Sequence, residues 1–299
     1  MAFRDDRHRP AGRRESPAAH GKGWLASAGE WFTESLAPGL GEWFTESLVP
    51  GLKDLVYPPR PLCPFCGQPF TPARGILLCP GCLQRLPLVQ PPVCRVCGKP
   101  LRLSGAAGDK CQDCARYRHF FGMARAVGLF DGALREGIHQ LKYQGRRALG
   151  EAFASLMFSR LNAEPQMRRP GLLIPVPISP EKLERRGFNQ AALLAQGIGS
   201  RLGRPVAMDG LRRGRDTPAQ NRLDARQRRR NIAGAFTATA PAAVSGRSVL
   251  LIDDVYTTGA TADECARALL RAGAREVNVL TLAVGVLDRH WLGAGFPPA

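Results

Sequence analysis

Four pairs of cysteines constrain the fold of this 299-residue chain more than any other feature, because each pair places two thiols where one metal ion can hold both. Eight of the nine cysteines form C-x-x-C pairs, with 12 residues between the first two pairs and 13 between the last two. These spacings are close to those of zinc ribbons. We therefore expect one or two structural Zn2+ ions at these residues. The pairs are Cys63 and Cys66, Cys79 and Cys82, Cys94 and Cys97, and Cys111 and Cys114.

The segments around these pairs repeat along the chain. Cys63-Pro-Phe-Cys-Gly-Gln-Pro69 is matched 31 residues later by Cys94-Arg-Val-Cys-Gly-Lys-Pro100. In both, a Gly follows the second Cys, and we expect it to adopt the left-handed backbone that turns amides toward sulfur. The repeat favours sequential pairing with one zinc ion per unit, although the spacing also allows an interleaved arrangement. Disulfides are the alternative, and the absence of an apolar export signal argues against them.

The ninth cysteine and the N-terminal region lead to separate expectations. Cys265 and Leu269 have helical i, i+4 spacing, which predicts a buried and inert thiol. Residues 1–54 are expected to be disordered at first and then to contain short duplicated helical segments, because 29–40 and 41–52 repeat each other. The duplication is either a docking or membrane-surface segment or a recent copy that packs loosely, and the sequence leaves both interpretations open.

Beyond the cysteine-rich region, predicted strands alternate with predicted helices. The apolar segments 125–130, 172–178, 249–252 and 277–283 are typical of strands in a parallel sheet that is buried on both faces. We predict an α/β fold, a twisted parallel sheet flanked by helices over residues 121–290, behind a double zinc ribbon over residues 55–120. No apolar run is long enough to span a membrane, so we expect a cytoplasmic protein.

Residues 249–261, Val-Leu-Leu-Ile-Asp-Asp-Val-Tyr-Thr-Thr-Gly-Ala-Thr, carry the strongest chemical signal. An apolar strand delivers Asp253 and Asp254 to its C-terminal end, where ligands bind in open α/β sheets. The following loop, 257–261, can direct backbone amides at a phosphate beside the positive end of the next helix. The two carboxylates suit the vicinal hydroxyls of a ribose, with Mg2+ as a further neutralising partner.

This stretch resembles the phosphoribosyl-diphosphate (PRPP) motif of the type I phosphoribosyltransferases, except that Tyr256 stands where an aliphatic residue is more usual. Segments 138–143, 175–178, 185–190 and 229–236 resemble signatures of the ComF family. With the cysteine-rich region, the resemblance covers about residues 55–288. It implies a phosphoribosyltransferase-like domain behind a zinc ribbon, and an association with natural competence and DNA uptake.

The resemblance also implies roles for individual residues. Asp253 and Asp254 would hold the ribose 2′- and 3′-hydroxyls, with Lys142 as a basic catalytic candidate. The loop at Pro177 and the side chain of Arg186 would bind pyrophosphate, which leaves C1 of the ribose through an oxocarbenium-like transition state. No covalent protein nucleophile is needed. The residues expected at the 5′-phosphate are Thr257, Thr258, Gly259, Ala260 and Thr261.

The charge of the chain indicates an anionic partner. The net charge is +17, and 36 of the 42 basic residues are arginine, which grips phosphate with two parallel hydrogen bonds. An arginine cluster lies in the polar stretch 212–232, which is interpreted as a mobile loop over the site, a solvated helix or a nucleic-acid patch. All three interpretations stay open. The cluster contains Arg226, Arg228, Arg229 and Arg230.

Two functions of different classes fit these observations. The first is a Mg2+-dependent phosphoribosyltransferase that acts on a nitrogenous base during competence or nucleotide metabolism. The second is a non-catalytic PRPP or nucleotide sensor that binds single-stranded DNA or proteins of DNA uptake. Between Cys63 and Cys114 the only aromatic residues are Phe65 and Phe70, so the zinc region offers little for base stacking. The intact acidic pair favours PRPP binding in either case.

Overall fold

The computed structural model describes residues 60–104, 106–167, 170–214 and 225–285. The expectations for residues 1–54 and for the side chains of Arg226, Arg228 and Arg229 lie outside the described residues.

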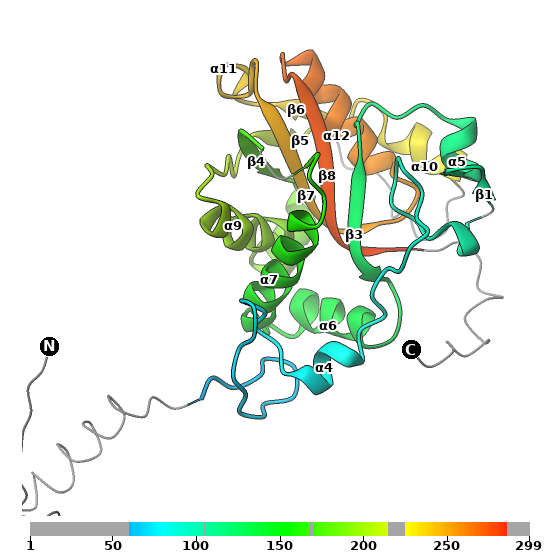
Figure 1. Cartoon of the computed structure of the whole chain (residues 1–299). Coiled ribbons are helices and arrows are strands. Elements are labelled where there is room, and N and C mark those ends of the chain that lie inside the picture. The colour runs from blue at the N-terminus through cyan, green and yellow to red at the C-terminus, as the bar shows by residue number, and fades with distance from the viewer. Residues whose placement is uncertain (1–59, 105, 168–169, 215–224, 286–299) are drawn as a thin grey trace, which may run out of the picture. The chain divides into compact units, whose positions relative to one another are not determined.

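Within the described residues, the central sheet has four parallel strands in the order β3-β8-β7-β4 (Figure 1). This confirms the predicted fold class. The strands are buried almost throughout, as their apolar sequences require when helices cover both faces. They are β3 Ala124–Leu129, β4 Leu172–Pro175, β7 Ser248–Tyr256 and β8 Glu276–Val284.

β8 is one residue longer at each end than predicted, and two other strands differ more from their predictions. β7 continues through both aspartates to Tyr256, because β8 pairs with it as far as Tyr256 opposite Val284. The acidic pair therefore lies inside the strand, where successive side chains point to opposite faces. β4 ends at Pro175, earlier than the predicted residue 178: the Val176 amide still donates to the Ile252 carbonyl, but Pro177 has no amide to continue the ladder.

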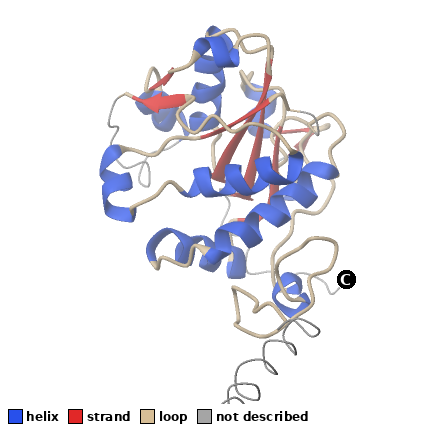
Figure 2. Ribbon diagram, turned by 90° about the vertical axis from the view of Figure 1, so that its left-hand side faces the viewer, coloured by secondary structure: helices blue, strands red, loops and turns tan. Residues whose placement is uncertain are grey.

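Helices cover both faces of the sheet (Figures 1 and 2). Leu250 and Ile252 of β7 pack in one core cluster with α6, α7 and α9, while Val249 and Leu251 pack in another with α12. The alternation follows from the two-residue repeat of a strand. The flanking helices are α6 Gly132–Tyr143, α7 Ala148–Asn162, α9 Gln190–Leu202 and α12 Ala260–Arg271.

Smaller elements lie beside α12 and between the main strands and helices. The antiparallel strands β5 Leu211–Arg213 and β6 Phe236–Ala238 pair with each other, and β6 contacts α12. Three short helices complete this part of the chain: α8 Pro180–Arg186, α10 Ala225–Ile232 and α11 Pro241–Val244. The polar stretch 212–232 thus contains the end of β5 and all of α10, and residues 215–224 lie outside the described part.

The cysteine-rich region consists of short elements built around two similar turns. Gly67 and Gly98 have φ of 75° and 70°, as expected, and their amides donate to the carbonyls of Cys63 and Cys94. The same backbone bond thus closes each turn of the sequence repeat. The elements of this region are α4 Pro80–Gln84, η2 Leu101–Leu103, β1 Ala106–Ala107, β2 Lys110–Cys111 and α5 Gln112–Arg116.

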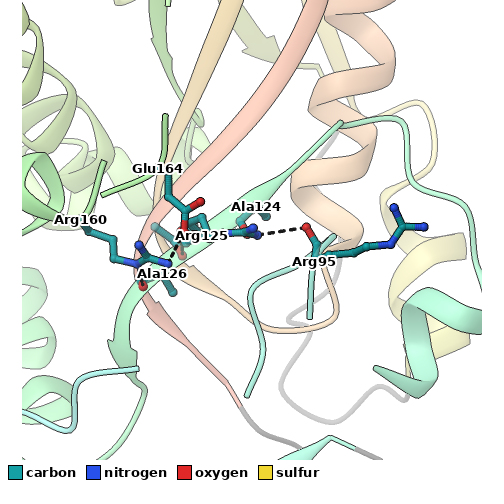
Figure 3. A network of polar contacts seen from close by, with 7 residues as sticks. Arg95, Ala124, Arg125, Ala126, Arg160 and Glu164 are labelled. Atoms are coloured by element: carbon teal, nitrogen blue, oxygen red, sulfur yellow. Dashed lines mark hydrogen bonds and ion pairs between the residues drawn. The ribbon is translucent and has the colours of Figure 1, made fainter. Parts of the chain in front are cut away.

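A buried arginine fixes the second half of the cysteine-rich region, residues 94–114, to the edge of the sheet (Figure 3). We call this half the second ribbon. Arg125 of β3 is 6% exposed, and its Nη1 donates to the Arg95 carbonyl, which lies between Cys94 and Cys97. Its Nε lies 2.9 Å from Glu164 Oε1, which Arg160 also contacts at 2.7 Å. A buried charge is tolerated only when paired and hydrogen-bonded in this way, so the network holds the ribbon in one position on the sheet.

Candidate functional site

The two aspartates of β7 face different surroundings. Asp254 is 5% exposed and points toward α6 and α9, whereas Asp253 is half-buried and lines a small hollow with the loop that precedes α12. The Asp253 carboxylate also accepts the backbone N–H of Asp254 at 2.8 Å. The pleat of the strand therefore directs the two adjacent carboxylates to opposite faces, although the sequence prediction gave them one common role.

Asp254 is already held by protein groups. Its Oδ2 forms an ion pair with Lys142 Nζ at the last turn of α6, and its Oδ1 accepts a hydrogen bond from Gln190 Nε2 at 3.1 Å. Burial alone would raise the pKa of Asp254, but the Lys142 charge and these hydrogen bonds outweigh it and hold the pKa below its usual value. The expectation that both carboxylates face a ribose differs from this arrangement, in which Asp254 faces Lys142.

Asp253 has the opposite electrostatic character. Burial, together with the nearby Asp254 charge, raises its pKa well above the ordinary value. The hollow that Asp253 shares with Thr257, Gly259 and Thr261 offers hydroxyls and a helix N-terminus to a ligand. A carboxylate beside such a cradle needs a positive or hydroxylic partner, and oxygen is the ligand atom that Mg2+ prefers. The residues present therefore fit a ribose with Mg2+.

The loop 257–261 has the backbone of an anion-binding turn. Gly259 has φ of 76°, and a Cβ added there would overlap the Tyr256 hydroxyl, so only glycine fits. Helix α12 begins directly afterwards, and its first-turn amides lack partners inside the helix. Thr258 and Ala260 are buried, whereas Thr257 and Thr261 are partly exposed. The loop can therefore present amides and two hydroxyls to a phosphate.

Basic side chains from three segments gather beside the Lys142 side of the site. Burial lowers the pKa of Lys182, and the charges of Arg213, Arg186 and Lys142 lower it further. Each of these cations therefore lies near enough to Lys182 for its charge to act on it. The sequence prediction included Lys142 and Arg186 but missed Lys182 and Arg213. A site that concentrates four cations is suited to a strongly anionic group such as pyrophosphate.

Gln190 connects this basic group to the acidic pair. Arg186 Nη1 donates to Gln190 Oε1 at 3.1 Å, while the amide nitrogen of Gln190 donates to Asp254. Arg186 Nη2 also donates to Tyr143 Oη at 2.9 Å, with the guanidinium 4.9 Å from the ring centroid. Gln190 was not among the predicted site residues, although it lies in a segment that carried the family resemblance. It orients Arg186 and Asp254 at once.

The remaining candidates lie near the edge of the site. Pro177 is half-buried in the loop between β4 and α8, where the Asn189 side chain donates to the Val176 carbonyl at 3.0 Å. This loop follows the end of β4, the neighbour of β7 in the sheet, as expected for a ligand-binding loop. Arg230 of α10 is exposed.

The eight paired cysteines form two separate sets, each with its sulfur atoms within 4.8 Å of one another. The grouping is sequential, as the repeat predicted. Four thiols this close fit one tetrahedral Zn2+, and a site with four protein ligands is structural. In the second set, hydrogen bonds among the sulfurs lower the pKa of Cys111 to about 6. Cys265 is fully buried in α12, and burial raises its pKa. The sets are Cys63, Cys66, Cys79 and Cys82, and Cys94, Cys97, Cys111 and Cys114.

Family models match both parts of the chain. Residues 52–115 match a double zinc ribbon domain, and residues 183–290 match a phosphoribosyl transferase domain. The predicted fold class and zinc-binding module are thereby confirmed. Among the described residues, no helix combines the length and apolarity needed to cross a bilayer.

Similar proteins are known from several bacteria. The DNA utilization protein YhgH of Escherichia coli O157:H7 is 34% identical over 219 residues, which cover 69% of this chain and 96% of that protein. Competence protein F of Haemophilus influenzae is 30% identical over 69% of this chain and 90% of its own length. A solved glutamine PRPP amidotransferase from B. subtilis is 22% identical over 44% of this chain and 25% of that chain, with a TM-score of 0.29. That superposition is too partial to bear on function.

Proposed function

This chain belongs to the ComF family, and from that premise we propose that it binds PRPP with Mg2+ and transfers the phosphoribosyl group to a nitrogenous base. The observation that carries the proposal is the hollow shared by Asp253 and the loop 257–261. It places a carboxylate beside a phosphate cradle, which suits a ribose 5-phosphate: the hydroxyls meet the carboxylate and the phosphate meets the amides.

The proposed roles divide the site into three parts. Asp253 holds the ribose hydroxyls and contributes carboxylate oxygen to Mg2+, which when bound screens the charge of the leaving pyrophosphate. The loop 257–261 holds the 5′-phosphate. Lys182 and Arg186 face the pyrophosphate, and Asp254 with Gln190 keeps Lys142 and Arg186 in position. The narrower role for Asp254 follows from its burial and its ion pair with Lys142.

The reaction under this proposal is a displacement at C1 of the ribose. A base nitrogen forms the new bond to C1, the C1–O bond to pyrophosphate breaks, and the electron pair leaves with the pyrophosphate. The chain supplies orientation and positive charge where the pyrophosphate leaves, which are the main sources of acceleration for such a transfer. We further propose that this chemistry takes place in the cytoplasm and serves competence and nucleotide metabolism; the names of two relatives, which mention DNA utilization and competence, support the link to competence.

Calorimetric titration of PRPP with Mg2+ into the zinc-loaded protein tests the proposal. We expect saturable binding that is lost in Asp253→Asn and retained in Asp209→Asn, a matched change at an exposed position. Pyrophosphate release is then measured with a panel of bases. If the unaltered protein and Asp253→Asn both fail to bind PRPP, the proposed function is wrong.

A second function, binding of single-stranded DNA, is favoured by one surface segment. Shortly after Cys114, the last cysteine of the second set, four exposed side chains follow, with Tyr117 at 43% and Phe120 at 51%: Arg116, Tyr117, Arg118 and Phe120. Alternating arginine and aromatic side chains can grip the phosphate backbone and stack on bases. The sequence prediction counted aromatic residues only as far as Cys114, and it interpreted His119 beside Phe120 and Phe121 as packing at the domain junction.

A further inference from the structure

The segment that joins the second cysteine set to the sheet, residues 117–121, contacts both flanks of the phosphate loop 257–261. On one side it reaches Asp263 in the first turn of α12, and on the other it reaches Tyr256, the residue before Thr257. The loop is therefore enclosed by contacts that originate in the zinc-binding region. Neither contact is needed merely to close the sheet, whose ladder runs through β3, β8, β7 and β4.

His119 makes the first of these contacts. Its side chain is 1% exposed, with Nε2 3.4 Å from Cys114 Sγ and Nδ1 3.4 Å from Asp263 Oδ1. The imidazole therefore lies between Cys114, a member of the second cysteine set, and the first turn of α12. The neighbouring Phe120 N–H donates to the same Asp263 oxygen at 2.6 Å. Groups that hydrogen-bond a metal ligand and the ligand itself orient one another, so the positions of His119 and Cys114 are coupled.

Phe121 makes the second contact. It is 2% exposed, and its ring stacks on His119 with centroids 4.5 Å apart. The same ring meets Tyr256 edge to face at 6.2 Å. Tyr256 in turn occupies the space beside the Gly259 backbone. Stacked rings in a close-packed interior transmit displacement, because no free volume absorbs it.

We propose that the second zinc centre, through His119, positions the phosphate loop and so sets the affinity of the protein for a 5′-phosphate. The inference rests on the proposed function. Zn2+ fixes Cys114, Cys114 fixes His119, and His119 with the Phe120 amide fixes Asp263 and the first turn of α12. A phosphate-binding amide must lie within about 0.5 Å of its productive position, so a small shift of this turn weakens binding. His119 is thus a positioning residue.

Removal of the Asp263 carboxylate can either weaken or tighten phosphate binding, and the direction distinguishes a positioning role from a purely electrostatic one. A carboxylate in the first turn of α12 repels a phosphate bound at that helix end, so its removal on charge alone would tighten phosphate binding. If Asp263 acts as the attachment point for His119 and Phe120, its removal weakens binding instead. The two explanations predict opposite results for one variant.

The experiment compares two probes, ribose 5-phosphate and inorganic pyrophosphate, by calorimetry on the full zinc-loaded chain. The variants are His119→Leu and Asp263→Ala, and the control is Asp113→Asn, which removes a charge paired with Lys99 in the same ribbon. We expect ribose 5-phosphate to bind about tenfold more weakly in both variants, and pyrophosphate to bind as before. Zinc content is measured in each, and Asp263→Ala, which removes a residue outside both cysteine sets, is expected to retain two ions.

Three results would overturn the inference. Unchanged or tighter binding of ribose 5-phosphate by zinc-loaded Asp263→Ala would show that charge, and not positioning, governs this end of the helix. Equal weakening of both probes would indicate general loss of structure. Failure of the unaltered protein to bind ribose 5-phosphate would refute the proposed function itself, and the inference would fall with it. If His119→Leu does not fold, Asp263→Ala decides the question.

Discussion

Lys142 Nζ forms an ion pair with Asp254 Oδ2, and this contact joins the last turn of α6 to the strand that carries the acidic pair. Both side chains are largely buried, at 17% and 7% exposed. The pair depends on two segments more than 100 residues apart in the chain, so it forms only when α6 packs against the sheet. It couples the stability of the domain to the geometry of the candidate site.

Removing Lys142 is expected to leave a buried and unpaired carboxylate. Lys142→Met should lower the free energy of unfolding by about 3 kcal/mol, measured by urea denaturation at pH 7. The double variant with Asp254→Asn should recover part of the loss. Arg95→Met, which breaks an exposed pair with Asp109, should change stability by less than about 1 kcal/mol. Equal losses in Lys142→Met and Arg95→Met would contradict the prediction.

Asp253→Asn should stabilise the fold at neutral pH while it abolishes PRPP binding. The folded-state pKa of Asp253 is raised above its ordinary value of 3.8, so stability falls as pH rises through the interval between the two values. Asparagine removes this penalty and still accepts the Asp254 N–H. Thermal melts should therefore show a gain at pH 7 that disappears below about pH 3.8, where the carboxyl is protonated in both states. A gain that persists at low pH would point to another cause.

Gly259→Ala should destabilise the phosphate loop by more than the cost of placing alanine at a positive φ. Gly246 has a similar positive φ, 71°, but open space around its Cβ position, so Gly246→Ala should cost only about 1 kcal/mol. At Gly259 the added methyl also displaces the Tyr256 ring, and we expect a larger loss together with loss of ribose 5-phosphate binding. Comparable stability and binding in the two variants would argue against the tight fit at Gly259.

Two zinc ions per chain are expected from elemental analysis of the purified protein. Cys97→Ser should reduce the content to about one ion, because it removes a ligand from the second set alone. Cys265→Ser should retain both ions, since that thiol lies in α12 outside either set. Loss of both ions from Cys97→Ser would instead indicate that the two centres share ligands or fold as one.

The exposed segment after α5 should contribute to DNA binding if the second function holds. Tyr117→Ala combined with Phe120→Ala should weaken binding of a single-stranded oligonucleotide, at about 1–3 kcal/mol for each lost base stack. Arg116→Gln should instead make the slope of log K against log salt shallower by about one, which corresponds to the loss of one phosphate contact. Leu183→Ala, another exposed apolar position, serves as the control. Fluorescence anisotropy across a salt series measures all three, and identical affinities would exclude this surface.

Local sequence patterns determined much of this protein. A two-residue gap brings two thiols to one ion, and the sequence repeat pointed to sequential pairing, which matches the cysteine sets of the structure. Apolar runs marked the four strands, because a strand buried on both faces has few polar positions. The turn at Gly259 was also readable, since a glycine directly before a helix allows the left-handed backbone that the loop adopts.

The tertiary structure alone decided what each site residue faces. Lys142 and Gln190 reach Asp254 from separate segments, and their meeting depends on how α6 and α9 pack on a sheet whose strand order, β3-β8-β7-β4, no local pattern encodes. The pleat of β7, extended by its pairing with β8, turned two adjacent carboxylates into one that faces the loop and one that faces Lys142. Likewise, the sequence indicates only that His119, beside Phe120 and Phe121, packs at a domain junction, and the tertiary structure brings it between Cys114 and Asp263.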